Sequence, residues 1–376
     1  MGELSGAAPA LIRLAALWLA VTAAALLAGC STRPQQGVLI PVADATGGGS
    51  RVHLLAATTR QRSTTDPGEM FNGGRADSVS YASVVVSIPP DNARTIGEVQ
   101  WPTSPPGDPA RNFVTVSADY LDRQRFVSAL DAEAAQTGRH KVLVFVHGFN
   151  NRFDDAVYRF AQIAHDSKAP AIPVLFTWPS RGEARLRAYT YDRESANFSR
   201  DAFDRLLDLL SSQPSVDQIT ILAHSMGNWI ALEALRTRAI RTAGKPDKIK
   251  NVLLVAPDVD VDVFRTQIRR IGTANRRFAL FVSQDDDALA LSSKIWGGVP
   301  RLGNVNPEAE PYHSEFEQNH IEVFDLTSLK SAGDNAHSRA FEDVTSVTAM
   351  IEQRFAQGQR LVDKDPSGEI RNAIGE

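Results

Sequence analysis

The sequence has a single cysteine, Cys30, in 376 residues, so no intramolecular disulfide can form and a cysteine-based metal site is excluded. It also lacks an excess of basic residues, because 40 Lys and Arg stand against 44 Asp and Glu, with a net charge of −4. No cluster of Lys and Arg is interleaved with aromatics, and we therefore expect no nucleic acid partner. Neither a cofactor fingerprint nor a metal-ligand spacing is present, so we expect no cofactor and no metal.

An apolar run at residues 14–27 follows a single basic residue, Arg13, and ends in Leu27-Ala28-Gly29-Cys30. The run is shorter than the roughly 20 residues of a membrane-spanning helix and is typical of a secretory signal. Its end resembles a bacterial lipobox, in which cleavage before the cysteine makes that cysteine the lipidated first residue. Two or more acyl chains, at about 0.8 kcal/mol per buried CH₂, anchor a protein stably. An uncleaved anchor helix and an ordinary signal peptide are the alternatives.

These features predict the organisation of the chain. Residues 1–29 are expected to form a lipoprotein signal peptide and residues 30–50 a flexible tether. Residues 51–360 are expected to form one large domain, and residues 361–376 a frayed tail. Ser31 after Cys30 resembles a signal for the outer membrane. We therefore expect a lipid-anchored protein of the bacterial cell envelope, with the membrane as its partner through Cys30.

The body of the chain predicts an α/β fold. Strand-like segments at residues 52–58, 80–88, 98–101 and 113–116 indicate an extra β segment ahead of the main fold, followed by a helix at 119–137. Apolar strands then alternate with helical segments, at residues 142–146, 172–177, 218–223, 252–256, 278–282 and 321–324. Such βα repeats predict a doubly wound, mostly parallel sheet. Ligands of these sheets bind at the carboxyl ends of the strands.

The central motif is Ala223-His224-Ser225-Met226-Gly227, which follows an apolar run and precedes apolar residues at helical spacing. The pattern predicts a strand, a sharp turn and a helix, with Ser225 at the apex. It is typical of the nucleophile elbow of α/β hydrolases, in which small residues two before and two after the serine let strand and helix pass closely. Ala223 stands where the common motif has glycine, which adds one methyl group at this contact. The sequence predicts Ser225 as a nucleophile.

A nucleophilic serine needs a histidine base, an acid that orients the base, and N–H donors for the oxyanion. In α/β hydrolases these residues follow the order serine, acid, histidine. His313 and His320 precede the last predicted strand, which places them at the amino end of the sheet. His337 lies beyond the carboxyl end of that strand and is the predicted base.

Two acidic clusters compete for the role of the acid, and both follow a strand at its carboxyl end. In most members of the fold the acid follows the second strand after the elbow strand, which favours the cluster after residues 278–282. The other aspartates are expected to cap helices or to lie in loops. The two clusters are Asp258, Asp260 and Asp262, and Asp285, Asp286 and Asp287.

The oxyanion donors are expected to be two backbone N–H groups. One belongs to Met226, directly after the nucleophile, and the other lies in the loop after residues 142–146. Phe149 is favoured for the second, with Asn150 as the alternative. We expect His147, His165 and His224 to have structural roles.

Five segments together resemble a bacterial family of α/β hydrolases catalogued as a domain of unknown function, and the resemblance covers residues 52–354. It implies an α/β-hydrolase domain within residues 51–360. It also implies Asp286 as the acid, because the family keeps the middle aspartate of the stretch that reads Asp285-Asp286-Asp287 here. His337-Ser338 matches the late histidine element of the family, with Ala336 in place of glycine. The segments are Phe145-Val146-His147-Gly148-Phe149-Asn150, Phe176-Thr177-Trp178-Pro179-Ser180, Tyr191-Asp192-Arg193-Glu194-Ser195-Ala196, Ala223-His224-Ser225-Met226-Gly227-Asn228 and Ala256-Pro257-Asp258-Val259-Asp260-Val261-Asp262-Val263-Phe264.

The sequence thus predicts a serine hydrolase that cleaves ester or thioester bonds through an acyl-enzyme, with a lipid or lipophilic ester as the substrate class suggested by the anchor. The alternative is a catalytically inert envelope lipoprotein that uses the fold as a binding module. Trp178 is expected to wall an acyl pocket or to pack in the core. Arg181, Arg185 and Arg187 are expected to meet an anionic head group or to lie in a solvated loop.

Overall fold

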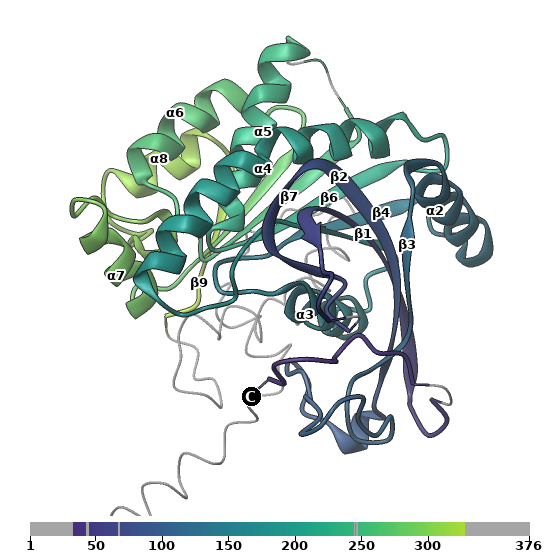
Figure 1. Cartoon of the computed structure of the whole chain (residues 1–376). Coiled ribbons are helices and arrows are strands. Elements are labelled where there is room, and N and C mark those ends of the chain that lie inside the picture. The colour runs from purple at the N-terminus through teal and green to yellow at the C-terminus, as the bar shows by residue number, and fades with distance from the viewer. Residues whose placement is uncertain (1–32, 43–44, 67, 244, 246, 328–376) are drawn as a thin grey trace, which may run out of the picture.

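The computed structural model describes residues 33–42, 45–66, 68–243, 245 and 247–327 (Figure 1). The predicted signal peptide, the lipidation site Cys30, the predicted base His337 and the predicted tail at residues 361–376 lie outside the described residues. Among the residues that are described, no helix is long and apolar enough to cross a membrane.

A nine-stranded sheet forms the centre of the described structure. Of these strands, only β2 runs antiparallel to its neighbours, so the predicted doubly wound, mostly parallel sheet is confirmed. In spatial order the strands are β3 (Val114–Leu121), β2 (Phe71–Ile88), β1 (Ser50–Arg62), β5 (Ile172–Thr177), β4 (Lys141–Val146), β6 (Gln218–His224), β7 (Ile249–Val255), β8 (Arg277–Val282) and β9 (Ile321–Asp325).

The predicted extra β segment is present and continues the main sheet, because β1 pairs in parallel with β5, from Leu55 opposite Val174 to Thr58 opposite Thr177. The strand expected at residues 98–101 is absent. This short stretch is irregular and follows a turn at Gly97, which has a φ of 85°. Trp101 there stacks on Tyr158 instead of joining a ladder.

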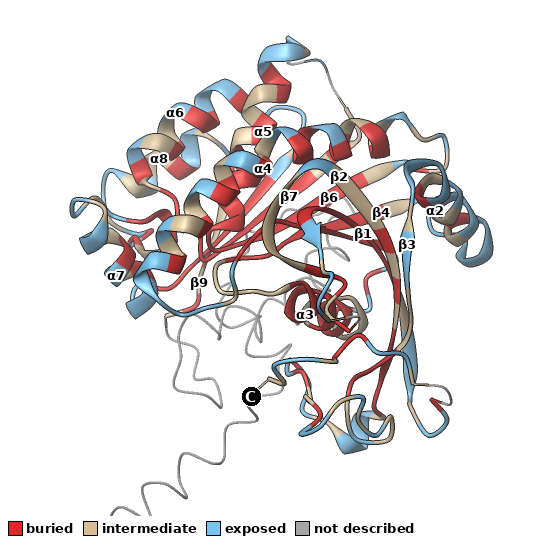
Figure 2. Cartoon of the chain, in the orientation of Figure 1, coloured by how far each residue is buried: buried red, intermediate tan, exposed pale blue. Residues whose placement is uncertain are grey.

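Helices cover both faces of the sheet, and the apolar residues form one core on each face (Figure 2). Successive residues of β4 from Val142 to Val146 alternate between the cores, which explains why this part of the strand is a continuous apolar run. The helix α3 (Phe153–Asp166) packs on one face. The other face carries α2 (Arg123–Thr137), α4 (Leu186–Ser212), α5 (Gly227–Arg241), α6 (Val261–Ile271) and α8 (Tyr312–Gln318), while the short α7 (Asp287–Ile295) lies beyond the end of β8.

The helix α2 begins later than the sequence pattern predicts, and α4 is unusually long. The strand β3 extends through Leu121, so α2 starts at Arg123, after Asp122 accepts a hydrogen bond from the backbone N–H of Arg125 at 2.8 Å. The helix α4 begins at Leu186 and contains 27 residues. It therefore spans the whole sheet and brings its first turn to the carboxyl end of the strands.

The described residues before β1 pack on the domain, which differs from the flexible tether expected for residues 30–50. Val38 and Leu39 are buried. The carbonyl of Val38 accepts hydrogen bonds from the Thr115 hydroxyl at 3.1 Å and the Tyr158 hydroxyl at 3.0 Å. This segment is held in place by its two buried apolar side chains and by the hydrogen bonds to a buried carbonyl.

Candidate active site

Ser225 occupies the sharp turn between β6 and α5. Its φ of 50° is unusual for a residue other than glycine and stores backbone strain. The turn persists because hydrogen bonds fix it from both sides. The N–H of Ser225 donates to the carbonyl of Val255 at 2.9 Å, and the side-chain amide of Asn228 donates to the carbonyls of Ser225 and Val255, both at 3.0 Å. This is the geometry that the Ser225 motif predicts.

Two glycines allow the turn to sit against the end of β4. A Cβ on Gly227 would lie 2.5 Å from the carbonyl oxygens of Val146 and His147. A Cβ on Gly148 would lie 2.9 Å from the Cβ of Ser225. Ala223, in contrast, fits within the parallel ladder, paired with Val146 and fully buried. The tight contact of this elbow is therefore at Gly227, and the alanine two residues before the serine leaves the turn intact.

Ser225 lines a cavity of about 610 Å³ at the carboxyl end of the strands. One side of the cavity is polar and is formed by Asn150, Asn151 and Arg33. Another part of the lining is apolar and is formed by Leu186 at the start of α4 together with Leu289, Leu291 and Ile295 of α7. A nucleophile between a polar and an apolar wall is suited to a substrate that has both kinds of group.

The loop after β4 brings Phe149 into this cavity, and Met226 lies directly after the serine. Neither backbone N–H donates to another described residue. The N–H of Asn150, in contrast, is hydrogen-bonded to the carboxylate of Asp192. Of the two candidates for the second oxyanion donor, Phe149 therefore keeps its N–H available, whereas that of Asn150 is engaged.

His147, next to this loop, has a structural role, as expected. Burial lowers its pKa well below the usual 6.5, and the charge of Arg60 lowers it further, so the ring is neutral. Its Nε2 accepts a hydrogen bond from the backbone N–H of Trp178 at 3.2 Å, and its Nδ1 therefore carries the proton and donates to the carbonyl of Gly148 at 2.9 Å. Trp178 is fully buried and stacks on His147 with ring centroids 4.9 Å apart, so of its two expected roles it has the packing one.

A buried arginine and a buried carboxylate hold the loop from behind. Arg60 of β1 donates to the Thr177 hydroxyl at 2.9 Å, to the Ser180 carbonyl at 2.8 Å and to the Asn151 carbonyl at 2.7 Å. Burial lowers the pKa of Arg60 to about 10, which leaves it charged at neutral pH.

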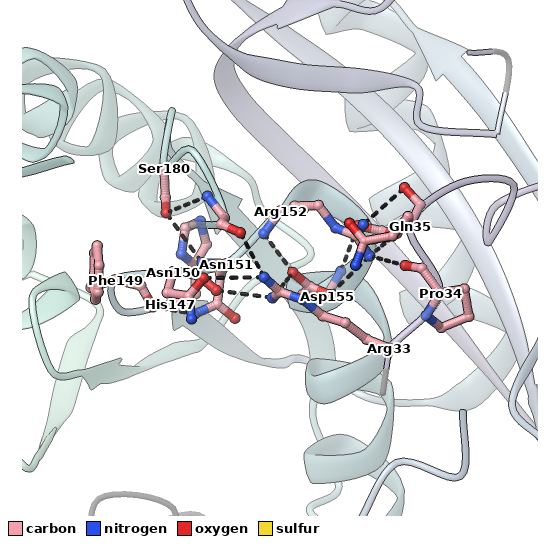
Figure 3. A network of polar contacts seen from close by, with 12 residues as sticks. Arg33, Pro34, Gln35, His147, Phe149, Asn150, Asn151, Arg152, Asp155 and Ser180 are labelled. Carbon is pink, nitrogen blue, oxygen red and sulfur yellow. Dashed lines mark hydrogen bonds and ion pairs between the residues drawn. The ribbon is translucent and has the colours of Figure 1, made fainter. Parts of the chain in front are cut away.

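Asp192 of α4 accepts hydrogen bonds from the Ser180 hydroxyl and from the N–H of Arg181 at 2.9 Å, and burial raises its pKa. Figure 3 shows part of this network, with Ser180 beside Asn151 and His147. Sequence reasoning missed both Arg60 and Asp192. Arg60 lies just beyond the strand predicted at residues 52–58, so no pattern singled it out, whereas Asp192 lies in the Tyr191-Asp192-Arg193 segment of the family resemblance.

The structure places the predicted acid, Asp286, directly after β8 and before α7. The residue is buried, and its Oδ1 caps α7 by accepting a hydrogen bond from the N–H of Leu289 at 3.0 Å. Its neighbours Asp285 and Asp287 are exposed. Among the described residues, no group of three His, Cys, Asp or Glu side chains is placed to hold a metal ion.

In the competing cluster, Asp260 caps α6 and Asp262 pairs with Arg265 on that helix. Asp258 lines the cavity, but its carboxylate accepts hydrogen bonds from the hydroxyls of Tyr189 and Ser292, each at 2.6 Å. It also lies 3.4 Å from the Nε of Arg301. Asp258 is thus part of a polar cluster in the cavity lining, and its backbone N–H donates to the carbonyl of Ser225 at 3.2 Å.

The other predicted residues are distributed as follows. His313 pairs with Glu317 on α8, and His320 lies just before β9, away from Ser225 as expected. Of the three arginines after Trp178, only Arg185 lines the cavity, and its side chain is exposed. Arg181 lies over the ring of Tyr191 at 4.0 Å.

Comparisons with known proteins agree with this architecture. A model of the family described as alpha/beta hydrolase of unknown function (DUF900) matches residues 123–354, which is more than half of the chain. No curated protein matches the chain.

Three solved structures resemble the chain at low identity. An esterase from Pyrobaculum calidifontis has 12% identity and a TM-score of 0.31, with 62% of this chain and 94% of the esterase covered. An acylaminoacyl peptidase from Pyrococcus horikoshii has 11% identity and a TM-score of 0.35, with 79% of this chain and 42% of the peptidase covered. A lipase-esterase related protein from Clostridium acetobutylicum has 13% identity and a TM-score of 0.28, with 59% and 95% covered. At these TM-scores the similarities carry no information about substrate or mechanism.

Proposed function

The chain belongs to the alpha/beta hydrolase family of unknown function, and on this premise we propose that it is a serine hydrolase that cleaves carboxylic ester or thioester bonds. The observation that carries the proposal is the position of Ser225. It sits at the apex of a strained turn, it lines a cavity of about 610 Å³, and the N–H groups of Phe149 and Met226 are free of other described partners.

The proposed reaction proceeds in two halves. The Ser225 hydroxyl attacks the substrate carbonyl while His337 takes its proton, and the N–H groups of Phe149 and Met226 stabilise the oxyanion. Collapse of the intermediate forms the acyl-enzyme and expels the alcohol or thiol, which receives the proton from His337. Water then attacks the acyl-enzyme with His337 as base, which releases the acid and regenerates Ser225. Asp286 orients the His337 ring in both halves.

We place this activity at the bacterial cell envelope, with Cys30 as the lipidated residue that anchors the protein. The supporting observation is the Leu27-Ala28-Gly29-Cys30 sequence after an apolar run. A lipid or lipophilic ester is the substrate class that an enzyme anchored at a membrane would meet.

The test is labelling of the purified full chain with a fluorophosphonate, followed by peptide mass spectrometry. The reagent forms a phosphorus–oxygen bond with an activated serine and loses fluoride. We expect one adduct, on Ser225, that disappears in Ser225→Ala and is lost or slowed in His337→Ala and Asp286→Asn.

Ser283→Ala is a matched control, since this serine lies at the same edge of the sheet and its hydroxyl donates to Asp285 at 2.6 Å. The control should label as the wild type does. A folded wild type that forms no adduct would contradict the proposal and favour the inert binding module.

A further inference from the structure

We propose that the mouth of the Ser225 cavity faces the membrane, and that the substrate is an ester carried by a lipid of the bilayer to which the chain is anchored. This inference rests on the proposed function and on the proposed anchor at Cys30. Its new element is a physical connection between the anchor and the cavity, which the described part of the N-terminal segment supplies.

Arg33 makes that connection, because it lines the Ser225 cavity and is held there by four hydrogen bonds. Its guanidinium donates to the backbone carbonyl of Asn150 at 3.0 Å, to the Asn150 side chain at 3.1 Å and to the carbonyl of Gly182 at 2.7 Å. It also forms an ion pair with Asp155 of α3. Figure 3 shows Arg33 reaching from the N-terminal segment to the loop that carries Phe149.

The next residues keep the segment in this position. Arg152, at the start of α3, donates to the carbonyl of Pro34 at 2.6 Å and to the carbonyl of Gln35 at 2.9 Å (Figure 3). Val38 and Leu39 then enter the core. The point at which the chain leaves the domain toward its anchor is therefore fixed beside the cavity, and the domain cannot turn freely on this segment.

Chain length limits how far the cavity can lie from the anchor. Cys30 precedes Arg33 by three residues, and a fully extended chain advances about 3.6 Å per residue. The Cα atoms of Cys30 and Arg33 are thus at most about 11 Å apart. Acyl chains on Cys30 would therefore hold the polar wall of the cavity at the level of the lipid head groups.

The apolar wall of the same cavity is exposed to an unusual degree. Leu186 is 60% exposed, Leu291 is 59% exposed and Ile295 is 36% exposed. Among the described residues, these three are part of a set of eight large hydrophobic side chains with high exposure, and all three line this cavity. A lipid surface would cover side chains that water solvates poorly.

Electrostatic attraction to lipid head groups does not orient the domain in place of these apolar contacts. The net charge of −4 would repel the domain from anionic lipids, although Arg185 offers one exposed cation at the rim. The lipid anchor and the exposed apolar wall of the cavity are therefore both needed to orient the cavity toward the membrane. The lipid that enters would place its acyl chain against Leu186, Leu291 and Ile295 and its ester carbonyl at Ser225.

The test uses the full chain in vesicles of phosphatidylethanolamine with a minor share of phosphatidylglycerol. Two fluorogenic substrates are compared, a water-soluble short-chain ester and a long-chain ester embedded in the vesicle. Insertion of a flexible Gly-Ser spacer of about 20 residues after Ser31 lengthens the tether and lowers the effective concentration of the cavity at the surface. We expect the spacer to lower hydrolysis of the embedded ester about tenfold while the soluble ester is hydrolysed at the wild-type rate.

A second variant, Leu186→Ser with Leu291→Ser, should lower the rate on the embedded ester at least about fivefold more than the rate on the soluble ester. Ile240→Ser is its matched control. Ile240 is 46% exposed, but it lies near the far end of α5, at the opposite edge of the sheet from Ser225, and both rates should stay unchanged.

The outcomes separate this inference from the proposed function. Hydrolysis of the soluble ester alone, or equal rates on the embedded ester in the wild type, the spacer variant and the rim variant, would overturn the membrane-facing cavity and leave the serine hydrolase intact. A wild type that hydrolyses neither ester and forms no fluorophosphonate adduct would overturn both.

Discussion

The two walls of the Ser225 cavity are built in different ways. The wall that carries Phe149 is fixed by a buried network in which Thr177 links Arg60 to His147 and Ser180 links Arg60 to Asp192 through hydrogen bonds. The wall formed by α7 is a nine-residue helix whose Leu291 and Ile295 are exposed. The difference teaches that the groups proposed to stabilise the oxyanion are held by buried polar contacts, whereas the surface proposed to meet the acyl chain is a short helix with exposed apolar side chains.

The largest effect is expected from Ser225→Ala, which removes the proposed nucleophile but neither wall. Ester turnover should fall by about 10⁴-fold or more, because the remaining groups bind the substrate without forming an acyl-enzyme. The measurement is kcat on a soluble ester, with circular dichroism to show that the fold is kept. A loss of less than about tenfold would mean that another group performs the chemistry.

Asp192→Asn tests the wall that carries Phe149. The substitution removes the charge that binds Ser180, Arg181 and the N–H of Asn150. The loop after β4 that carries Phe149 should therefore become less ordered. We expect kcat to fall by about 10²-fold with little change in KM, since an oxyanion donor acts mainly in the transition state.

Asp166→Asn is the control for that experiment, because the side chain of Asp166 is also shielded from solvent and pairs with Arg94, but it lies at the end of α3. It should lower the free energy of unfolding and leave kcat unchanged. Equal losses of kcat in the two variants would indicate a general effect of instability instead of a positioned loop.

A pH dependence follows from the depressed pKa of His147. The unfolded state binds a proton near pH 6.5 whereas the folded state does not, so stability is lost as pH falls below about 6.5, by up to about 1.4 kcal/mol per pH unit. His147→Gln should remove this part of the slope. Urea unfolding at several pH values between 5 and 7 measures it, and parallel slopes for the two proteins would contradict a neutral, buried His147.

The smallest effect on stability is expected on the wall formed by α7. Leu291→Ser should change the free energy of unfolding by less than about 0.5 kcal/mol, because the side chain is 59% exposed. Val144→Ser, in the fully buried strand β4, is the contrasting variant and should cost about 2 kcal/mol or more. A large loss at Leu291 would show that the two walls are equally well packed.

The sequence was sufficient for the parts of this molecule that depend on local patterns. The turn at Ser225, the parallel strands and the α/β-hydrolase family were all predicted from short motifs, and they are confirmed. The predicted catalytic roles of Asp286 and His337 stay predictions, and His337 lies outside the described residues.

The polar network that holds the loop after β4 could not be predicted in the same way. Arg60, His147 and Asp192 lie in three separate segments of the chain, and hydrophobic periodicity does not reveal which distant polar groups meet. The packing of residues 33–42 was missed for a similar reason. A polar, glycine-containing stretch is typical of a linker, and only two apolar residues, Val38 and Leu39, are buried there.

The contacts of Arg33 also bear on how this chain tolerates mutation. If cleavage before Cys30 generates the mature protein, Arg33 is its fourth residue, so one short stretch serves both the sorting of the lipoprotein and the loop beside the nucleophile. The proposed sorting signal at Ser31 and the cavity contact at Arg33 would then lie two residues apart. Selection on the two roles would act on neighbouring codons.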